Sequence, residues 1–482
     1  MIRSADGFGP ARGARRVSLL ALLQDQVMVR WVISGCLAVL LVTAGGCELR
    51  PAGTAEEKRA VADAGRVYAP LVEERELPEV GDPADWRSVL RRAFLANGEL
   101  EAAYFEWAAA VARIDQAANW PNSNLAPSFG YMFSGGQMKA WDRTTVNVGF
   151  DPMQNVSFPT KTARAGRQAL ESARAAGQRF AARKFALQKQ VMQAWLDAAL
   201  MEEQIRIQRD NVSLLKLLSE TAADRVRAGA PQQDLLKAQI AHRLAEGELA
   251  RMEAEHHGME AAINGLMRRD PHAALNLPAA LPEPRPVWVE DDALIAAAVD
   301  AAPELGALAR DVAARRDALE LARMRFIPDV NPMAAFTGSV SQSLGAMVVL
   351  PTMVPAIRAS IEEARAMLRA SQAMAVQARA DRGAAFVAAL WSMRNAERLV
   401  ALYRDTVLPK AEQALASSRQ AYAAGQVAFV ELIDSQRTLL DVRLMIAQAR
   451  IAREKQLAEL EALAGIDVET LKNVKHEEKV TP

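Results

Sequence analysis

Alanine-rich stretches without proline, in which apolar residues recur at helical spacings, dominate the pattern of the chain. One stretch covers about residues 163–228, and another continues past Pro231 to about residue 267. Ordinary globular helices rarely exceed about 25 residues, so stretches of this length indicate coiled-coil-like helices. Gly229, placed between them, predicts a left-handed turn at the tip of an antiparallel helical hairpin.

Period-two alternation replaces the helical pattern at two short places. Apolar residues alternate with small or polar ones at 129–133 and again at 146–150, on either side of Ser134-Gly135-Gly136. This alternation predicts a β-hairpin with two different faces. A strand of a membrane barrel needs such a pattern, although a hairpin of an ordinary soluble domain shows it as well.

The same order of elements occurs twice along the chain. Gly229 and Gly425 are 196 positions apart, and so are Trp195 and Trp391. A period this long indicates a duplicated half-molecule, because solenoid repeats recur every 20–50 residues or so. In the second half we expect helices near 291–301 and 303–326, a weak strand pair near 334–340 and 346–350 that Pro332 interrupts, and long helices over 355–424 and up to about 464.

These patterns divide the chain into six segments. In order, they are an export signal over 1–46, an extended N-terminal lead over 47–84, a first repeat over 85–268, a Pro-rich linker over 269–290, a second repeat over 291–466 and a disordered tail over 467–482.

The N-terminus has the pattern of a lipoprotein signal. Arg30 precedes an apolar run over 31–42, which ends in Ala44-Gly45-Gly46-Cys47. A basic start, a short apolar core and small residues before the cleavage site define a signal peptide. Cys36 also follows a suitable short motif, but no apolar run leads to it, so we prefer Cys47 as the lipidated residue. Two buried cysteines in an anchor helix are the alternative, and Met28 is a possible start.

Composition excludes several classes of function. Lys and Arg together number 58, as do Asp and Glu, so the zero net charge gives no electrostatic footprint for nucleic acid. His256 and His257 are adjacent and point to different sides of a helix, so we expect a solvated helix face there and not a metal site. Neither a phosphate-binding glycine loop nor a serine-hydrolase motif occurs. We therefore expect no enzymatic activity, no cofactor and no metal.

Three ordered motifs carry a family resemblance. They are Asn97-Gly98-Glu99-Leu100, Ala126-Pro127-Ser128-Phe129-Gly130-Tyr131 and Gly229-Ala230-Pro231-Gln232-Gln233-Asp234-Leu235-Leu236. Together with the duplication and the lipoprotein signal, they make residues 85–465 resemble the TolC family of outer-membrane efflux proteins, in particular its lipoprotein branch. The resemblance implies a mainly α fold with a small β part. Duplicated helical hairpins would form a periplasmic tunnel, and four strands per protomer would enter a trimeric twelve-stranded outer-membrane β-barrel.

The resemblance also implies a function and partners. The chain would be the outer-membrane channel of a multi-part efflux system, a passive duct that docks onto a periplasmic adaptor and an inner-membrane pump. It would be a homotrimer in the bacterial outer membrane, anchored there through acylation of Cys47, with palmitate among the expected acyl groups. The physics of the bilayer agrees, because four strands cannot close a barrel and open edges are not tolerated in lipid. The alternative is a lipid-anchored periplasmic coiled-coil scaffold without a pore.

In this family the periplasmic helix tips close the tunnel with acidic or polar side chains. By position, the resemblance assigns this candidate gate to Gly229, Gln233, Asp234, Gly425, Glu431 and Asp434. The alternative for the polar members is an ordinary role at helix N-termini, where carboxylates interact favourably with the helix dipole.

We predict that Cys47 is the acylated first residue of the mature protein. A single acyl chain anchors a protein only weakly, so we expect two or more acyl groups on this residue. Mass spectrometry of the mature protein measures the modification. An unmodified peptide that spans Gly46 and Cys47 would contradict the prediction.

Overall fold

The structure, a computed structural model, describes residues 49–119, 125–133, 136–150, 157–278, 280–287, 291, 294–295 and 302–467. The elements below belong to one compact unit that begins at Arg50. The predicted export signal, Cys47 and nearly all of the predicted tail lie outside the described residues. No helix within the described part combines the length and the apolar character that crossing a membrane requires.

From residue 86 onward, the described elements follow each other in the order that the sequence predicts; most of the helix predicted near 291–301 lies outside the described residues. The first half contains α2 (Thr54–Gly65), α3 (Trp86–Ala96), α4 (Gly98–Ala118), β1 (Leu125–Tyr131), the 3₁₀ turn η1 (Trp141–Arg143), β2 (Thr144–Phe150), α5 (Pro159–Arg227) and α6 (Gln232–Leu266). The second contains α8 (Pro303–Arg323), the 3₁₀ turn η2 (Met324–Phe326), β3 (Asp329–Thr337), β4 (Ser341–Val349), α9 (Val354–Leu402), the π turn η3 (Tyr403–Val407), α10 (Leu408–Ala423) and α11 (Phe429–Ala464). The prediction of a mainly helical, duplicated fold with four strands is confirmed.

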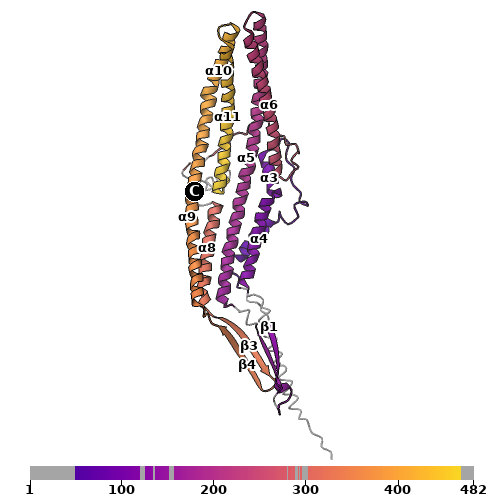
Figure 1. The fold of residues 1–482 in the computed structure, drawn as a ribbon, viewed down its shortest axis with the longest axis vertical. Helices are drawn as coiled ribbons and strands as arrows, with labels where there is room; N and C mark the ends of the chain where they lie inside the picture. Colours follow the sequence, from indigo (N-terminus) through magenta and orange to yellow (C-terminus); the bar gives the residue numbers. More distant parts are fainter. Residues whose placement is uncertain are drawn as a thin grey trace, which may run out of the picture. The chain divides into compact units, whose positions relative to one another are not determined.

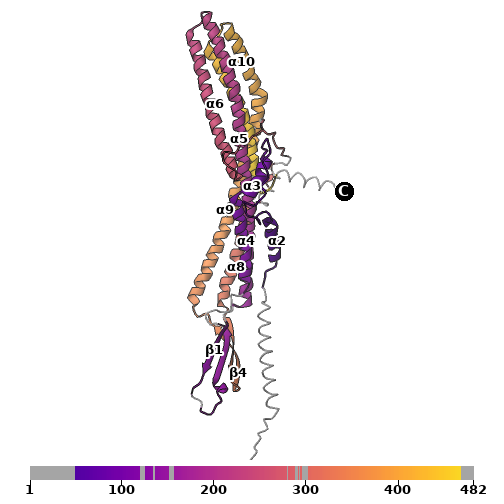
Figure 2. The same ribbon diagram turned by 90° about the vertical axis from the view of Figure 1, so that its right-hand side faces the viewer.

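Helix α5 lies at the centre of the helical packing and extends for 69 residues, or about 100 Å. Pro159 opens its first turn, where a missing N–H costs nothing, and no further proline interrupts it. Toward its N-terminal end it packs between α4 and α8, and α9 packs on α8; toward its C-terminal end it packs between α6 and α11 (Figures 1 and 2). Each half of the helical part is therefore a row of helices with two outer members.

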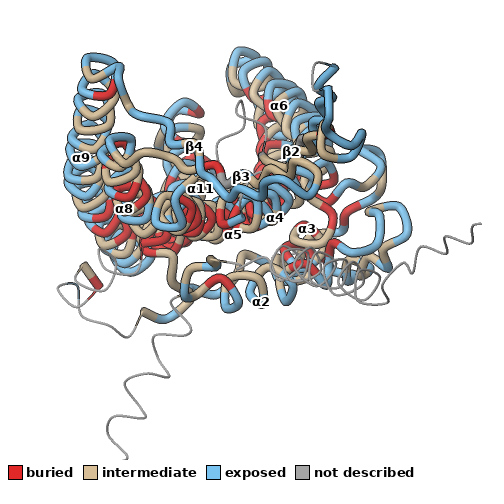
Figure 3. Tube along the Cα trace, turned by 90° about the horizontal axis from the view of Figure 1, so that it is seen from below, coloured by how far each residue is buried: buried red, intermediate tan, exposed pale blue. Residues whose placement is uncertain are grey.

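Buried residues follow this arrangement. They concentrate along α5 and α11, whereas α9 and α6 expose much of their surface (Figure 3). Three apolar clusters result: one around α3, α4 and α5, one between the two hairpin tips, and one between α9 and α11.

The four strands form one antiparallel sheet in the order β1-β2-β3-β4. The prediction that Pro332 breaks the second strand pair is wrong, because β3 and β4 each have nine residues and Pro332 pairs with Ala346 inside them. Strand β2 pairs with β3 only from Met333 onward. Pro332 thus lies where one side of β3 has no neighbouring strand among the described residues, a position that tolerates a missing N–H.

The predicted helix over 355–424 is confirmed, but it contains a π turn. Pro409 lies just after Tyr403–Val407, the five residues that adopt the wider turn. A proline inside a helix removes one N–H donor and clashes with the carbonyl four residues earlier. The π turn at this point relieves that conflict while the helix continues into α10.

The prediction of an extended lead over 47–84 is wrong for its first part, which contains α2. Helix α2 packs on α4: Trp107 Nε1 donates a hydrogen bond of 2.8 Å to Glu57, and Lys58 Nζ lies 2.6 Å from Asp115. Gly65 ends the helix against the Tyr104 hydroxyl, where any side chain would collide. The prolines near this segment flank α2 and do not interrupt it, so they gave no reason to exclude a helix.

The linker over 269–290 is tied to the helices through a buried charge cluster. The Arg285 guanidinium lies 3.1 Å from Glu454 and 2.9 Å from Glu461, which is 1% exposed. Burial opposes the positive charge, but the two carboxylates outweigh it and raise the pKa of Arg285. Loss of Arg285 would take the shared cation away from both carboxylates, and breaking a buried ion pair typically costs about 3–5 kcal/mol.

A buried chain of amides joins α6, α5 and α11. Gln208 Nε2 donates to the Ala245 carbonyl at 2.9 Å, Asn211 Nδ2 donates to Gln208 Oε1 at 3.2 Å, and Gln436 Nε2 donates to Asn211 Oδ1. All three amide side chains are buried. The hydrogen bonds fix the register of three helices whose apolar contacts alone would tolerate sliding.

We predict that Asn211→Leu destabilises the protein. The substitution removes the donor to Gln208 Oε1 and the acceptor for Gln436 Nε2, and a buried unsatisfied group costs about 1–3 kcal/mol. A fall in the thermal unfolding temperature of the purified protein measures the effect. Gln239→Leu, at an exposed position of α6, is the control and should change little.

Replacing the whole chain of amides shows whether such a loss of stability comes from unpaired amides or from the leucine side chains themselves. In the triple variant with leucine at 208, 211 and 436, no amide remains unpaired, so much of the stability should return. If the triple variant were less stable than Asn211→Leu by a similar step for each added leucine, the unpaired amides would not be the cause.

Candidate functional site

Both hairpin tips use the same backbone motif. Gly229 and Gly425 have φ angles of 99° and 77°, in the left-handed region. At the first tip the Ala230 N–H donates to the Arg225 carbonyl at 2.9 Å and the Gly229 N–H to Val226 at 3.0 Å; the second tip repeats both bonds at the corresponding positions. This is the Schellman arrangement, which caps the last carbonyls of a helix. The predicted glycine turns are confirmed as structure.

The requirement for glycine is conformational at both tips. A Cβ atom at Gly229 would meet no described atom within 4 Å, and one at Gly425 would make an ordinary contact of 3.5 Å with Arg225. Space is therefore available, but a left-handed backbone disfavours side chains, with a cost of about 1–2 kcal/mol. A substitution would change the turn before it disturbed the packing.

The two tips pack against each other through an aromatic cluster. Tyr422 and Phe429 are each 1% exposed, and their ring centroids lie 5.5 Å apart. Leu432 is equally buried beside them. The Arg225 guanidinium, from the first tip, lies 4.2 Å from the centroid of the Tyr422 ring. This cation–π contact joins residues that are almost 200 positions apart in the sequence.

Charges around Tyr422 act in opposite directions. Burial raises the pKa of the Tyr422 hydroxyl, the positive charge of Arg225 opposes that rise, and the nearby Asp234 carboxylate adds to it. Asp234 is half-buried. Among the polar residues of the candidate gate, Asp234 of the first tip thus lies close enough to Tyr422 of the second tip to act on its charge.

The other polar members of the candidate gate remain at the surface. Gln233, Glu431 and Asp434 are exposed. Asp234 and Glu431 both lie in the first turn of their helices, so the alternative of a favourable dipole interaction fits them as well. Arg225 and Tyr422 were not assigned a role from the sequence; their only signal was the position of each within four residues of a tip glycine.

The outer members of the sheet and of the helix rows expose apolar side chains. On the edge strands, Phe129 of β1 is 74% exposed and Leu344 of β4 is 87% exposed. On the outer helices, the large exposed apolar residues include Leu236, Ile240 and Leu244 of α6 and Met374, Val376 and Trp391 of α9. Leu236, Ile240 and Leu244 follow one another at intervals of four residues and so share one face of α6, and an apolar face left exposed is typical of contact with another protein or with lipid.

The two repeats differ in one pair of matched residues. Trp195 of α5 is 2% exposed and donates a hydrogen bond to the Ala84 carbonyl at 2.9 Å. Its counterpart Trp391 in α9 is 64% exposed. The repeat thus places one tryptophan at the centre of the row and the other on its outside.

Comparison with known proteins connects this architecture to solved structures. No protein-family model matches the chain, and no curated protein sequence matches it. The fold is similar to VceC, an outer membrane protein of Vibrio cholerae, with 16% identity over 79% of this chain and 96% of that chain and a TM-score of 0.66. The outer-membrane channel OprN gives 18% identity over 80% and 90% and a TM-score of 0.67. The Campylobacter jejuni outer membrane channel CmeC gives 11% over 82% and 89%, with a TM-score of 0.65. The resemblance to TolC-type channels is confirmed at the level of the fold.

We predict that Arg225→Ala raises the pKa of Tyr422 further and weakens the contact between the tips. The substitution removes the charge that opposes the effect of burial, and it removes a cation–π contact of about 0.5–2 kcal/mol. Alkaline titration of tyrosinate absorbance, with the curve of Tyr422→Phe subtracted, measures the shift. Arg227→Ala, two residues away and exposed, is the control. An unchanged Tyr422 titration in Arg225→Ala would contradict the prediction.

Proposed function

We propose that the chain is the outer-membrane channel component of a multi-part efflux system, a member of the TolC family that acts as a passive duct. One observation carries the proposal: the helices and strands, in an unbroken order over residues 86–464, have the fold of solved outer-membrane channels. In this proposal the strands stand in the outer membrane and the helices extend into the periplasm. Transport depends on the shape and lining of the duct, without a catalytic step.

The two open sides of the sheet and of the helix rows support an assembly of several copies, and we propose a trimer. Strands β1 and β4 each lack a neighbour on one side among the described residues. Four strands per chain give twelve in three copies, enough for a closed barrel, whereas four alone leave edges that lipid does not tolerate. The exposed apolar residues of α6 and α9 would then meet neighbouring protomers.

The hairpin tips are the proposed gate and docking point. The two turns, between α5 and α6 and between α10 and α11, stand at the end of the helices opposite the sheet (Figure 1). The proposed gate residues lie at or beside these turns; they are Gly229, Gln233, Asp234, Gly425, Glu431 and Asp434. We assign them to the constriction and to contact with a periplasmic adaptor, which links the channel to an inner-membrane pump. Acylation of Cys47 would add an anchor in the outer membrane.

Conductance of the purified full-length protein tests the proposal. In a planar bilayer, a trimeric channel should give stable steps of current, and its mass in detergent should be that of three chains. A protein that is monomeric and gives no current would instead support the alternative of a lipid-anchored scaffold without a pore.

We predict that Gly425→Val impairs export while the trimer still assembles. The backbone strain of about 1–2 kcal/mol is small against the packing of two long hairpins, but it displaces the tip. Trimer abundance in the outer membrane and survival under an exported toxic compound are the two measurements. Gly98→Val is the matched control, since Gly98 opens α4, away from the tips, with free space around it and without a positive φ.

Two outcomes would contradict that prediction. Loss of the trimer would show that the glycine is needed for assembly alone. An intact trimer with normal export would show that the shape of the tip does not control transport.

A further inference from the structure

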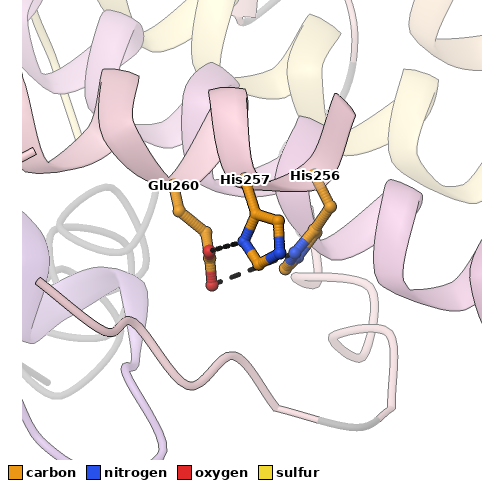
Figure 4. A group of neighbouring side chains, drawn as sticks. All are labelled: His256, His257 and Glu260. Carbon is orange, nitrogen blue, oxygen red and sulfur yellow. Dashed lines mark hydrogen bonds and ion pairs between the residues drawn. The ribbon is translucent and has the colours of Figure 1, made fainter. Parts of the chain in front are cut away.

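Four titratable side chains gather where α6 passes α5, near the C-terminal end of α6. His257 Nδ1 lies 3.0 Å from one carboxylate oxygen of Glu260, and His256 Nδ1 lies 3.9 Å from the other (Figure 4). His256 Nε2, on the opposite side of its ring, lies 3.6 Å from Glu202 of α5. Adjacent histidines point in different directions on a helix, but Glu260 lies one turn further on and reaches both of them.

The environment of His256 differs from the solvated helix face that the sequence predicts. Its side chain is 13% exposed, whereas that of His257 is 80% exposed and agrees with the prediction. His256 Nε2 is buried without a hydrogen-bond partner among the described groups, because Glu202 lies just beyond hydrogen-bonding distance. A buried polar atom left in this way costs about 1–3 kcal/mol, so an arrangement that gives Nε2 a hydrogen bond would be favoured.

The donor atoms have the chemistry and spacing that a zinc ion needs. One ligand atom from each of His256, His257 and Glu260 lies within 4.8 Å of the others. Zinc binds imidazole nitrogen and carboxylate oxygen at about 2.0–2.2 Å, which places neighbouring donors in a tetrahedral site about 3.3 Å apart. The two histidine nitrogens lie 3.0 and 3.9 Å from different oxygens of Glu260, so side-chain rotations that bring the three donors around one ion would complete the site.

Glu202 is placed to orient His256 from the side of the ring that faces away from the ion. A histidine that binds a metal through one ring nitrogen usually donates its other N–H to a carboxylate, which fixes the tautomer and orients the ring. With Nδ1 of His256 on the ion, the buried Nε2–H would point to Glu202 and gain the partner that it lacks. The exposed side of His257 leaves the fourth position of the ion to water.

We propose that His256, His257 and Glu260 form a binding site for a divalent transition-metal ion, for which Zn²⁺ fits best, and that Glu202 positions His256. The site joins α6 to α5, since its ligands come from one helix and its positioning residue from the other. It goes beyond the proposed channel function and is independent of it. A bound ion would hold the two helices of the first hairpin together at a level far from the tip.

Zinc binding to the full-length protein in detergent, prepared without a polyhistidine tag, tests the site. We expect one Zn²⁺ per chain by competition with a chromophoric chelator. Because His257 is exposed, His257→Ala should fold normally and lower the affinity at least tenfold. Glu202→Gln should lower it about tenfold, as is typical when the group behind a metal ligand is removed. Zn²⁺ should also raise the unfolding temperature of the wild type and not that of His257→Ala.

His242→Ala is the matched control, because His242 lies on the same helix beside a single carboxylate, Glu246, at 3.7 Å. Three results would overturn the proposal. They are equal zinc affinity in the wild type and His257→Ala, an equal loss of affinity in His242→Ala, and binding of Mg²⁺ as tight as that of Zn²⁺, which would indicate attraction to carboxylates alone.

Discussion

Unpaired backbone along the two edges of the sheet is the constraint on which the architecture depends. Strand β1 ends the sheet on one side and β4 on the other, and the outward N–H and C=O groups of each have no partner strand within the described chain. In water such edges invite aggregation, and in lipid they are too costly to persist. The helix rows also end in surfaces without a partner, because α6 and α9 expose large apolar side chains at the outer positions. Sheet and helices therefore both require neighbours, and the proposed arrangement of copies around an axis would supply them to both.

Inside the protomer, polar contacts set positions that apolar packing leaves free. Long alanine-rich helices offer many similar registers, because one small side chain packs much like the next. The amides of Gln208, Asn211 and Gln436 select one register near the tips, and Arg285 with its two buried carboxylates selects one where the linker crosses. Such groups contribute less to net stability than to specificity, because their desolvation offsets much of what they gain.

Local rules made most of the fold predictable. Glycine after a long helix fixed both tips, and alternation located the first strand pair, since both signals lie within a few neighbouring residues. The errors had wider causes. A proline breaks a strand that is paired on both sides, but it is tolerated where a strand is paired on one side only. Pro332 is in the second situation, because β2 pairs with β3 only from Met333 onward. The site was harder still, because Arg225 meets Tyr422, and His256 meets Glu202, only after distant helices pack. A single sequence carries no pairing signal for such contacts.

The π turn at Tyr403–Val407 changes the direction in which side chains point in the second repeat, although the number of residues between tryptophan and tip glycine is the same in both repeats. Trp195 precedes Gly229 by as many residues as Trp391 precedes Gly425, yet only the second path contains a wide turn. A π turn holds one residue more than an α turn, and each residue of an α-helix rotates the side chains by about 100°. The second tip is thus rotated by about that angle, relative to its tryptophan, compared with the first. Residues at matching positions of the two hairpins therefore face different directions at the tips, and in the proposed trimer the six tips would alternate between two kinds of surface.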